Sequence, residues 1–155
     1  MIESLVRLRA TLVAALAQVA FIGPLLPRLA VGYMFAETGW GKLQNIGQVV
    51  DFFTRIGIPA PEFQAHFVAG HELVCGALIV VGLATRLAAI PLTVIMAVAL
   101  ATAVEWEGLT GLIVTDEFTY AAVLVWLFVA GPGAASFDAL IARWAGAGSG
   151  ERSFR

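Results

Sequence analysis

Four apolar segments of this chain are each close to the length that a helix needs to cross a lipid bilayer. They run over residues 26–43, 63–83, 87–104 and 118–130, and the last must borrow residues from its flanks. A transmembrane helix needs about 20 predominantly apolar residues. Only 13% of the residues are charged, whereas about 25% is usual in a soluble domain. The sequence therefore predicts an all-α integral membrane protein whose spans form a four-helix bundle over residues 26–141.

The first 25 residues form a separate amphipathic segment. Leu5, Leu8, Leu12, Leu16 and Val19 follow helical spacing on one face, and Arg7, Thr11 and Gln18 fall on another. This pattern favours an interfacial helix lying in the headgroup layer, although a fifth span remains an alternative. At the other end, residues 142–155 are rich in glycine and serine and predict a flexible cytoplasmic tail.

The distribution of arginine and lysine predicts the orientation of the bundle. With four spans, one side holds seven basic residues and the other holds Lys42 and Arg55. The seven are Arg7, Arg9, Arg28, Arg86, Arg143, Arg152 and Arg155. Because cytoplasmic loops carry the excess of positive charge, both termini and the turn at 82–86 are expected in the cytoplasm. The acidic loop at 105–117 then faces outward.

Ionisable and thiol side chains interrupt two of the predicted spans. His71, Glu72 and Cys75 lie within FVAGHELVCGALIVVGL (67–83), and Glu37 lies in the first span. From the helical rise, His71 is about 15 Å and Glu37 about 12 Å from the outer ends of their helices. An ionisable group at the bilayer centre costs about 2.5–3.5 kcal/mol. These groups are therefore expected to face one another, to face water, or to be neutral.

Three interpretations of this polar group stay open. The first is a structural network that holds helices together. The second is a site for a quinone or another redox cofactor, bound by Glu37, His71 and Glu72, which would exchange protons with its headgroup. The third is a metal site in which His71 and Cys75, four residues apart, bind one ion with Glu72 or Glu37. For Cys75 alone, packing as a small apolar residue is favoured.

Four motifs in order resemble the DoxX family of small bacterial membrane proteins. They are RLAVGYMFAETGWGKL (28–43), VVDFFTRIGIPAPEF (49–63), HELVCGALIVVGLATRLAA (71–89) and GPGAASFDALI (131–141). The resemblance implies a compact four-helix protein of the bacterial inner membrane, and it treats residues 49–63 as a loop. The motif residues that carry over are Lys42, Glu72, Thr85, Arg86, Ser136 and Asp138. Of these, Arg86 and Asp138 are expected to pair on the cytoplasmic side.

Members of the DoxX family include a small subunit of a thiosulfate:quinone oxidoreductase and a membrane partner in a thiol and superoxide stress complex. The resemblance thus implies a small integral subunit or accessory protein of a redox-linked, quinone-associated membrane complex. Two alternatives remain: a stand-alone quinone- or metal-binding component that uses Glu37, His71, Glu72 and Cys75, and a structural or assembly factor. The expected partners are the lipid bilayer and a larger membrane complex. Nucleic acid is not expected, because the sequence has no basic patch.

Overall fold

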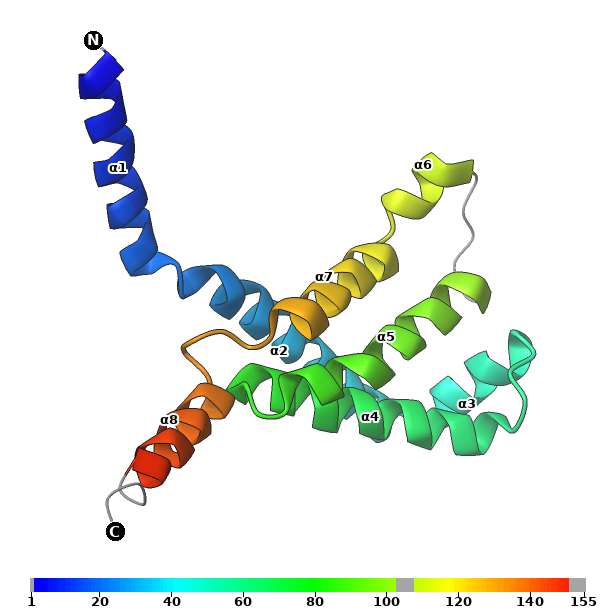
Figure 1. Cartoon of the computed structure of the whole chain (residues 1–155). Helices are drawn as coiled ribbons and strands as arrows, with labels where there is room; N and C mark the ends of the chain where they lie inside the picture. Colours follow the sequence, from blue (N-terminus) through cyan, green and yellow to red (C-terminus); the bar gives the residue numbers. More distant parts are fainter. Residues whose placement is uncertain (1, 103–107, 151–155) are drawn as a thin grey trace.

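The computed structural model describes residues 2–102 and 108–150, and within them the chain is helical without a strand. The helices pack side by side in the middle of the molecule, while the first and last extend away from it (Figure 1). Their bounds are α1 Ile2–Val19, α2 Ile22–Gln44, α3 Ile46–Arg55, α4 Pro61–Val81, α5 Thr85–Thr102, α6 Gly108–Ile113, α7 Asp116–Ala130 and α8 Phe137–Gly150.

Three segments of the described residues are long and apolar enough to cross a membrane: Leu5–Gln44, Pro61–Val81 and Thr85–Thr102. The predicted all-α membrane protein is thereby confirmed. Helix α7 has 15 residues and is about 23 Å long, shorter than a bilayer core of about 30 Å. The fourth span therefore stays a prediction, although α7 packs with α2 and α5 in the bundle.

Helices α2 and α4 form the closest contact of the bundle, and glycines make it possible. A Cβ atom on Gly39 would run into the backbone of Ala69 and Leu73, and one on Gly76 would run into the backbone of Ala36. At Gly32 a Cβ would lie 2.8 Å from the backbone nitrogen of Val80. Small residues let transmembrane helices approach closely enough for backbone packing. Direct contact between the two backbones thus fixes the position of α2 along α4.

One end of the bundle, which we call the closed end, is held by side chains that bind backbone groups. The Arg28 guanidinium donates to the carbonyl oxygens of Pro132 and Ala135, each at 2.7 Å. The Asp138 carboxylate accepts from the backbone nitrogens of Ala84 at 2.8 Å and Thr85 at 3.3 Å, at the first turn of α5. These contacts tie the start of α2, the α4–α5 turn and the α7–α8 loop together.

The structure differs from the sequence-based expectation in three segments. Residues 49–55, the first part of the segment 49–63 that the family resemblance treats as a loop, belong to helix α3. Of the outer loop predicted at 105–117, residues 105–107 lie outside the described residues, and the rest includes α6 and the start of α7. Helix α8 continues to Gly150, through most of the segment predicted as a flexible tail, because its alanines favour a helix.

Candidate ligand-binding site

A cavity of about 1080 Å³ lies at the end of the bundle opposite to the closed end. It is bounded by the last turns of α2 and α5, the first turns of α4 and α7, and the inner face of α3. Polar side chains of its lining stand at these helix ends: Asn45, Gln48, Gln64, Thr102 and Glu117. We call this end the cavity end and these five side chains its polar rim. Polar side chains are expected where a cavity meets the aqueous phase, because water can hydrogen-bond to them.

An ion pair lies in the wall of the cavity, deeper than the rim. Lys42 Nζ, from the last turn of α2, is 2.6 Å from Glu72 Oε1, in the middle of α4. The Glu72 side chain is 1% exposed and the Lys42 side chain 29% exposed. The second carboxylate oxygen, Glu72 Oε2, is buried without a hydrogen-bond partner. A buried acceptor left unpaired costs about 1–3 kcal/mol, so the site has an unused place for a hydrogen-bond donor.

The remaining walls are largely apolar and rich in aromatic rings. Helix α3 contributes Phe52 and Phe53, α2 contributes Phe35, and α7 contributes Tyr120. The rings of Phe35 and Tyr120 meet edge to face with centroids 6.1 Å apart. Binding pockets for small molecules are mostly apolar with a few convergent polar groups. This cavity therefore suits a ligand with a flat or aliphatic body and a polar head that both accepts from Lys42 and donates to Glu72.

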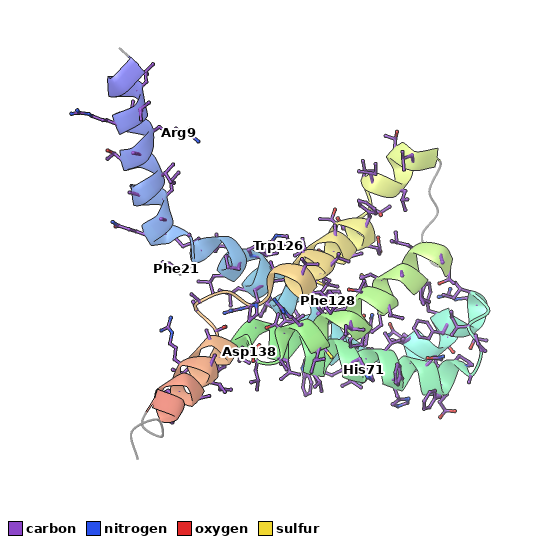
Figure 2. The ribbon with its side chains drawn as sticks, in the orientation of Figure 1. Arg9, Phe21, His71, Trp126, Phe128 and Asp138 are labelled. Carbon is purple, nitrogen blue, oxygen red and sulfur yellow. The ribbon has the colours of Figure 1, made fainter. Side chains whose placement is uncertain are left out.

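Of the three residues predicted to bind a cofactor, only Glu72 lines the cavity. Glu37 is exposed on α2. His71 is partly exposed on the outer surface of α4, where Figure 2 labels it, and its Nδ1 lies 2.8 Å from the carbonyl oxygen of Phe67. The structure therefore does not bring Glu37 and His71 to Glu72.

The residues predicted to bind a metal are likewise separated. Cys75 is buried in the apolar core among Phe35, Ile79 and Leu92, whereas His71 lies at the surface of α4. Within residues 2–102 and 108–150, no three His, Cys, Asp or Glu side chains gather closely enough to hold a metal ion. Packing against the core accounts for Cys75, as the sequence favoured.

The pairing of Lys42 with Glu72 is the feature that the sequence interpretation missed. Lys42 lies near the end of its helix and Glu72 is 11 residues into α4, so the two were placed at different depths. In the structure the stretch of α4 from Ala69 to Leu73 packs against Gly39 of α2, three residues from Lys42, which brings Glu72 within reach of the lysine. The available signal was that both residues belong to the family motifs and carry opposite charges.

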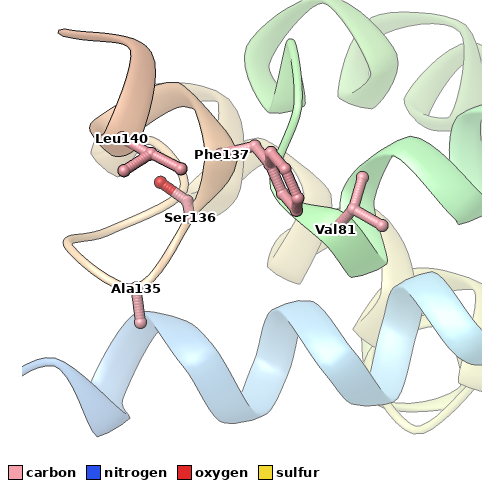
Figure 3. Close-up of a pocket in the computed structure, with 5 residues that line it drawn as sticks. All are labelled: Val81, Ala135, Ser136, Phe137 and Leu140. Atoms are coloured by element: carbon pink, nitrogen blue, oxygen red, sulfur yellow. The ribbon is translucent and has the colours of Figure 1, made fainter. Parts of the chain in front are cut away.

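The other motif residues lie at the closed end and bind backbone groups. Arg86 donates to the carbonyl oxygen of Val129 at 3.2 Å, and Asp138 caps α5, so the expected Arg86–Asp138 pair is replaced by two separate backbone contacts. Ser136 Oγ donates to the Gly133 carbonyl and accepts from the nitrogen of Ala139 in α8. Thr85 is fully buried. A shallow hollow of about 230 Å³ beside them is lined by Val81, Ala135, Ser136, Phe137 and Leu140 (Figure 3).

This fold and site define a class of protein: a small all-α membrane protein with an ion pair inside its helix bundle. The sequence profile of DoxX matches residues 23–105, more than half of the chain. The chain belongs to the DoxX family. The matched region contains α2 to α5 and thus both members of the Lys42–Glu72 pair.

Two curated relatives match part of the chain. The uncharacterized membrane protein Rv3486 of Mycobacterium tuberculosis is 44% identical over 70 residues, which is 44% of this chain and 43% of that protein. The Bacillus subtilis protein named "Putative oxidoreductase CatD" is 41% identical over 66 residues, 43% of this chain and 48% of that protein. The chain thus matches less than half the length of either relative. No solved structure matches the chain.

Proposed function

We propose that this protein is a small integral subunit or accessory protein of a redox-linked bacterial membrane complex, and that its cavity binds the headgroup of a quinone. The observation that carries the proposal is the Lys42–Glu72 pair, with a buried unpaired oxygen, in the wall of an apolar cavity. The Bacillus relative named as an oxidoreductase supports the redox link.

The residues of the cavity fit such a ligand. A quinone supplies two-electron chemistry that is coupled to protons, and its ring carries oxygens that accept hydrogen bonds when oxidised and donate them when reduced. Lys42 Nζ would donate to such an oxygen, and Glu72 Oε2 would accept from a hydroxyl group. Because Glu72 is nearly fully buried while Lys42 reaches toward the rim, the pair is suited to hold a proton between the ligand and the aqueous side.

We propose further that the protein resides in the bacterial inner membrane with both termini in the cytoplasm. Arg28 and Arg86 belong to the closed end and Arg143 to α8, whereas Lys42 and Arg55 belong to the cavity end, which fits the positive-inside rule. Helix α1 would lie along the membrane surface, since its apolar residues Leu5, Leu12 and Leu16 are more than half exposed. The cavity would then open toward the outer face.

The test is to purify the protein from its native membrane in mild detergent and to measure bound quinone and co-purifying proteins by mass spectrometry. We expect quinone in the preparation, together with larger membrane proteins. Glu72→Leu should lower the bound quinone about tenfold, the equivalent of one strong hydrogen bond. Glu62→Gln changes an exposed glutamate ten residues before Glu72 on the same helix; it is the matched control and should leave the bound quinone unchanged.

A purely structural role for the ion pair is the competing interpretation, because the pair also joins α2 to α4. It predicts that Glu72→Leu alters unfolding but leaves the bound quinone and the co-purifying proteins as they are. A preparation with neither quinone nor partner, from membranes in which the protein is intact, would contradict the proposal as a whole.

A further inference from the structure

Two ionisable side chains within the spans, Glu37 and His71, lie on the outside of the bundle. Within the described part of the chain, neither makes a hydrogen bond or ion pair with another helix: His71 contacts only Phe67, one turn before it in α4. An ionisable group at bilayer depth normally faces the protein interior, faces water, or pairs. We propose that Glu37 of one copy binds His71 of a second copy of this chain, so that the protein assembles through the outer faces of α2 and α4.

The two side chains point in opposite directions from the α2–α4 pair. The contact between these helices passes through Gly32 and Gly39 on α2 and through Ala69 and Gly76 on α4. At 100° per residue, Glu37 lies about 150° around α2 from its contact glycines, and His71 lies about 140° around α4 from Gly76. Glu37 therefore faces away from α4, and His71 faces away from α2. They cannot meet within one chain, but they can meet between two.

Both side chains lie at the same depth in the membrane. Gly39 packs against the stretch of α4 from Ala69 to Leu73, which contains His71, and Glu37 is only two residues from Gly39. The levels of Glu37 and His71 thus agree within about one helical turn, roughly 5 Å. Copies inserted with the same orientation keep their depths, so Glu37 of one copy is level with His71 of the next.

The chemistry of the two groups is complementary. His71 Nδ1 lies 2.8 Å from the carbonyl oxygen of Phe67; since a carbonyl only accepts, this nitrogen carries a proton. In the neutral imidazole, Nε2 is then an acceptor, and a protonated Glu37 carboxyl can donate to it. Transfer of that one proton to Nε2 gives an imidazolium and a carboxylate, an ion pair with the same atoms and the same net charge.

The basic side chains of α2 itself are already engaged. Lys42 is paired with Glu72, and Arg28 binds two carbonyl oxygens at the closed end. A second copy could therefore not offer either of them to Glu37 without breaking its own fold. Of the two histidines of α4, His71 is the one at the matching depth, because His66 lies five residues nearer to the start of the helix.

Exposed aromatic and aliphatic side chains surround both groups and provide the contact area. On α2, Tyr33 and Trp40 flank Glu37 and are 63% and 57% exposed. On α4, the ring of Phe67 lies beside that of His71 at a centroid distance of 4.0 Å and is tilted by 39°, and Val74 is 57% exposed. Since the α2 face of one copy meets the α4 face of the next, the contact is head-to-tail. Such contacts build a closed ring when the rotation between copies closes.

The first experiment is cross-linking in the native membrane with a Cys75→Ala background. Differently tagged Tyr33→Cys and Val74→Cys chains, which keep Glu37 and His71 and change exposed neighbours of each, are expressed together and treated with a short bis-maleimide. We expect cross-linked dimers from this mixture. Val125→Cys, exposed on α7, replaces Val74→Cys in the control mixture and should give none. Equal cross-linking in both mixtures would overturn the proposal.

The second experiment measures association by energy transfer between labelled copies in lipid vesicles at a series of protein-to-lipid ratios. Glu37→Leu and His71→Leu should each weaken association about tenfold, as expected for losing one interhelical hydrogen bond. The exchanged variant, Glu37→His with His71→Glu, should restore it. A monomeric wild-type protein over the whole series, or an exchanged variant no better than the single variants, would overturn the proposal. Neither result would bear on quinone binding, which is measured at Glu72.

Discussion

The ion pair with Lys42 stabilises the buried carboxylate of Glu72. The free energy of unfolding of the protein is therefore expected to depend on Lys42. If Lys42 is changed to Met, Glu72 keeps a buried charge without compensation, and we expect the free energy of unfolding to fall by about 3 kcal/mol. Replacing both residues, Lys42→Met with Glu72→Leu, should recover most of this loss, because an apolar pair needs no desolvation of charge.

The measurement for this pair is a double-mutant cycle by denaturant unfolding in mixed micelles, with exposed Glu62→Gln as the control for loss of a carboxylate on α4. If Lys42→Met unfolds like the wild-type protein, the 2.6 Å contact contributes nothing to stability. The pair would then have to be explained by ligand binding alone.

At the scale of the elements, the contact between α2 and α4 tolerates no added side chain. Gly39→Ala would place a Cβ against the backbone of Leu73, so the helices must separate, and we expect a loss of about 1–3 kcal/mol, as for other overpacked contacts. Gly41→Ala is the matched control two residues away on the same helix, where a Cβ meets nothing within 4 Å.

In the control, alanine should raise stability by about 0.5–1 kcal/mol, because it restricts the unfolded chain more than glycine does. The measurement is the free energy of unfolding of Gly39→Ala and of Gly41→Ala in the same micelles. Similar stabilities for Gly39→Ala and Gly41→Ala would show that the helices are not held at backbone contact.

At the scale of the whole molecule, the closed end and the cavity end are expected on opposite sides of the membrane. Asn45→Cys at the cavity end should react with a membrane-impermeant maleimide in intact bacterial cells, whereas exposed Ala134→Cys near the closed end should react only after lysis. Buried Cys75 is the internal control and should remain unlabelled in both. The reverse pattern of labelling would invert the proposed topology.

Much of this architecture could be predicted from the sequence, because membrane helices follow from length and apolar composition. The positions of α2, α4 and α5 were close to those expected. Helix α3 was missed because the resemblance indicated a loop there, although Val49, Phe52, Phe53 and Ile56 have helical spacing and all line the cavity.

The candidate site was predicted only in part, since the periodicity of one helix does not fix its rotation about its own axis. Glu72 and His71 are adjacent in the sequence, yet Glu72 is buried against Lys42 and His71 lies outside. That difference depends on which residues of α4 pack against Gly39, and only the three-dimensional contact shows it.

The Arg28 contacts also have a consequence for synthesis. Its two carbonyl partners, Pro132 and Ala135, follow it by 104 and 107 residues. At a translation rate of about 5–20 residues per second, the ribosome needs roughly 5–20 s to make them. Throughout that interval the Arg28 guanidinium cannot make these two hydrogen bonds. The closed end can therefore form only after the α7–α8 loop has been synthesised, however early α2 and α4 pack together.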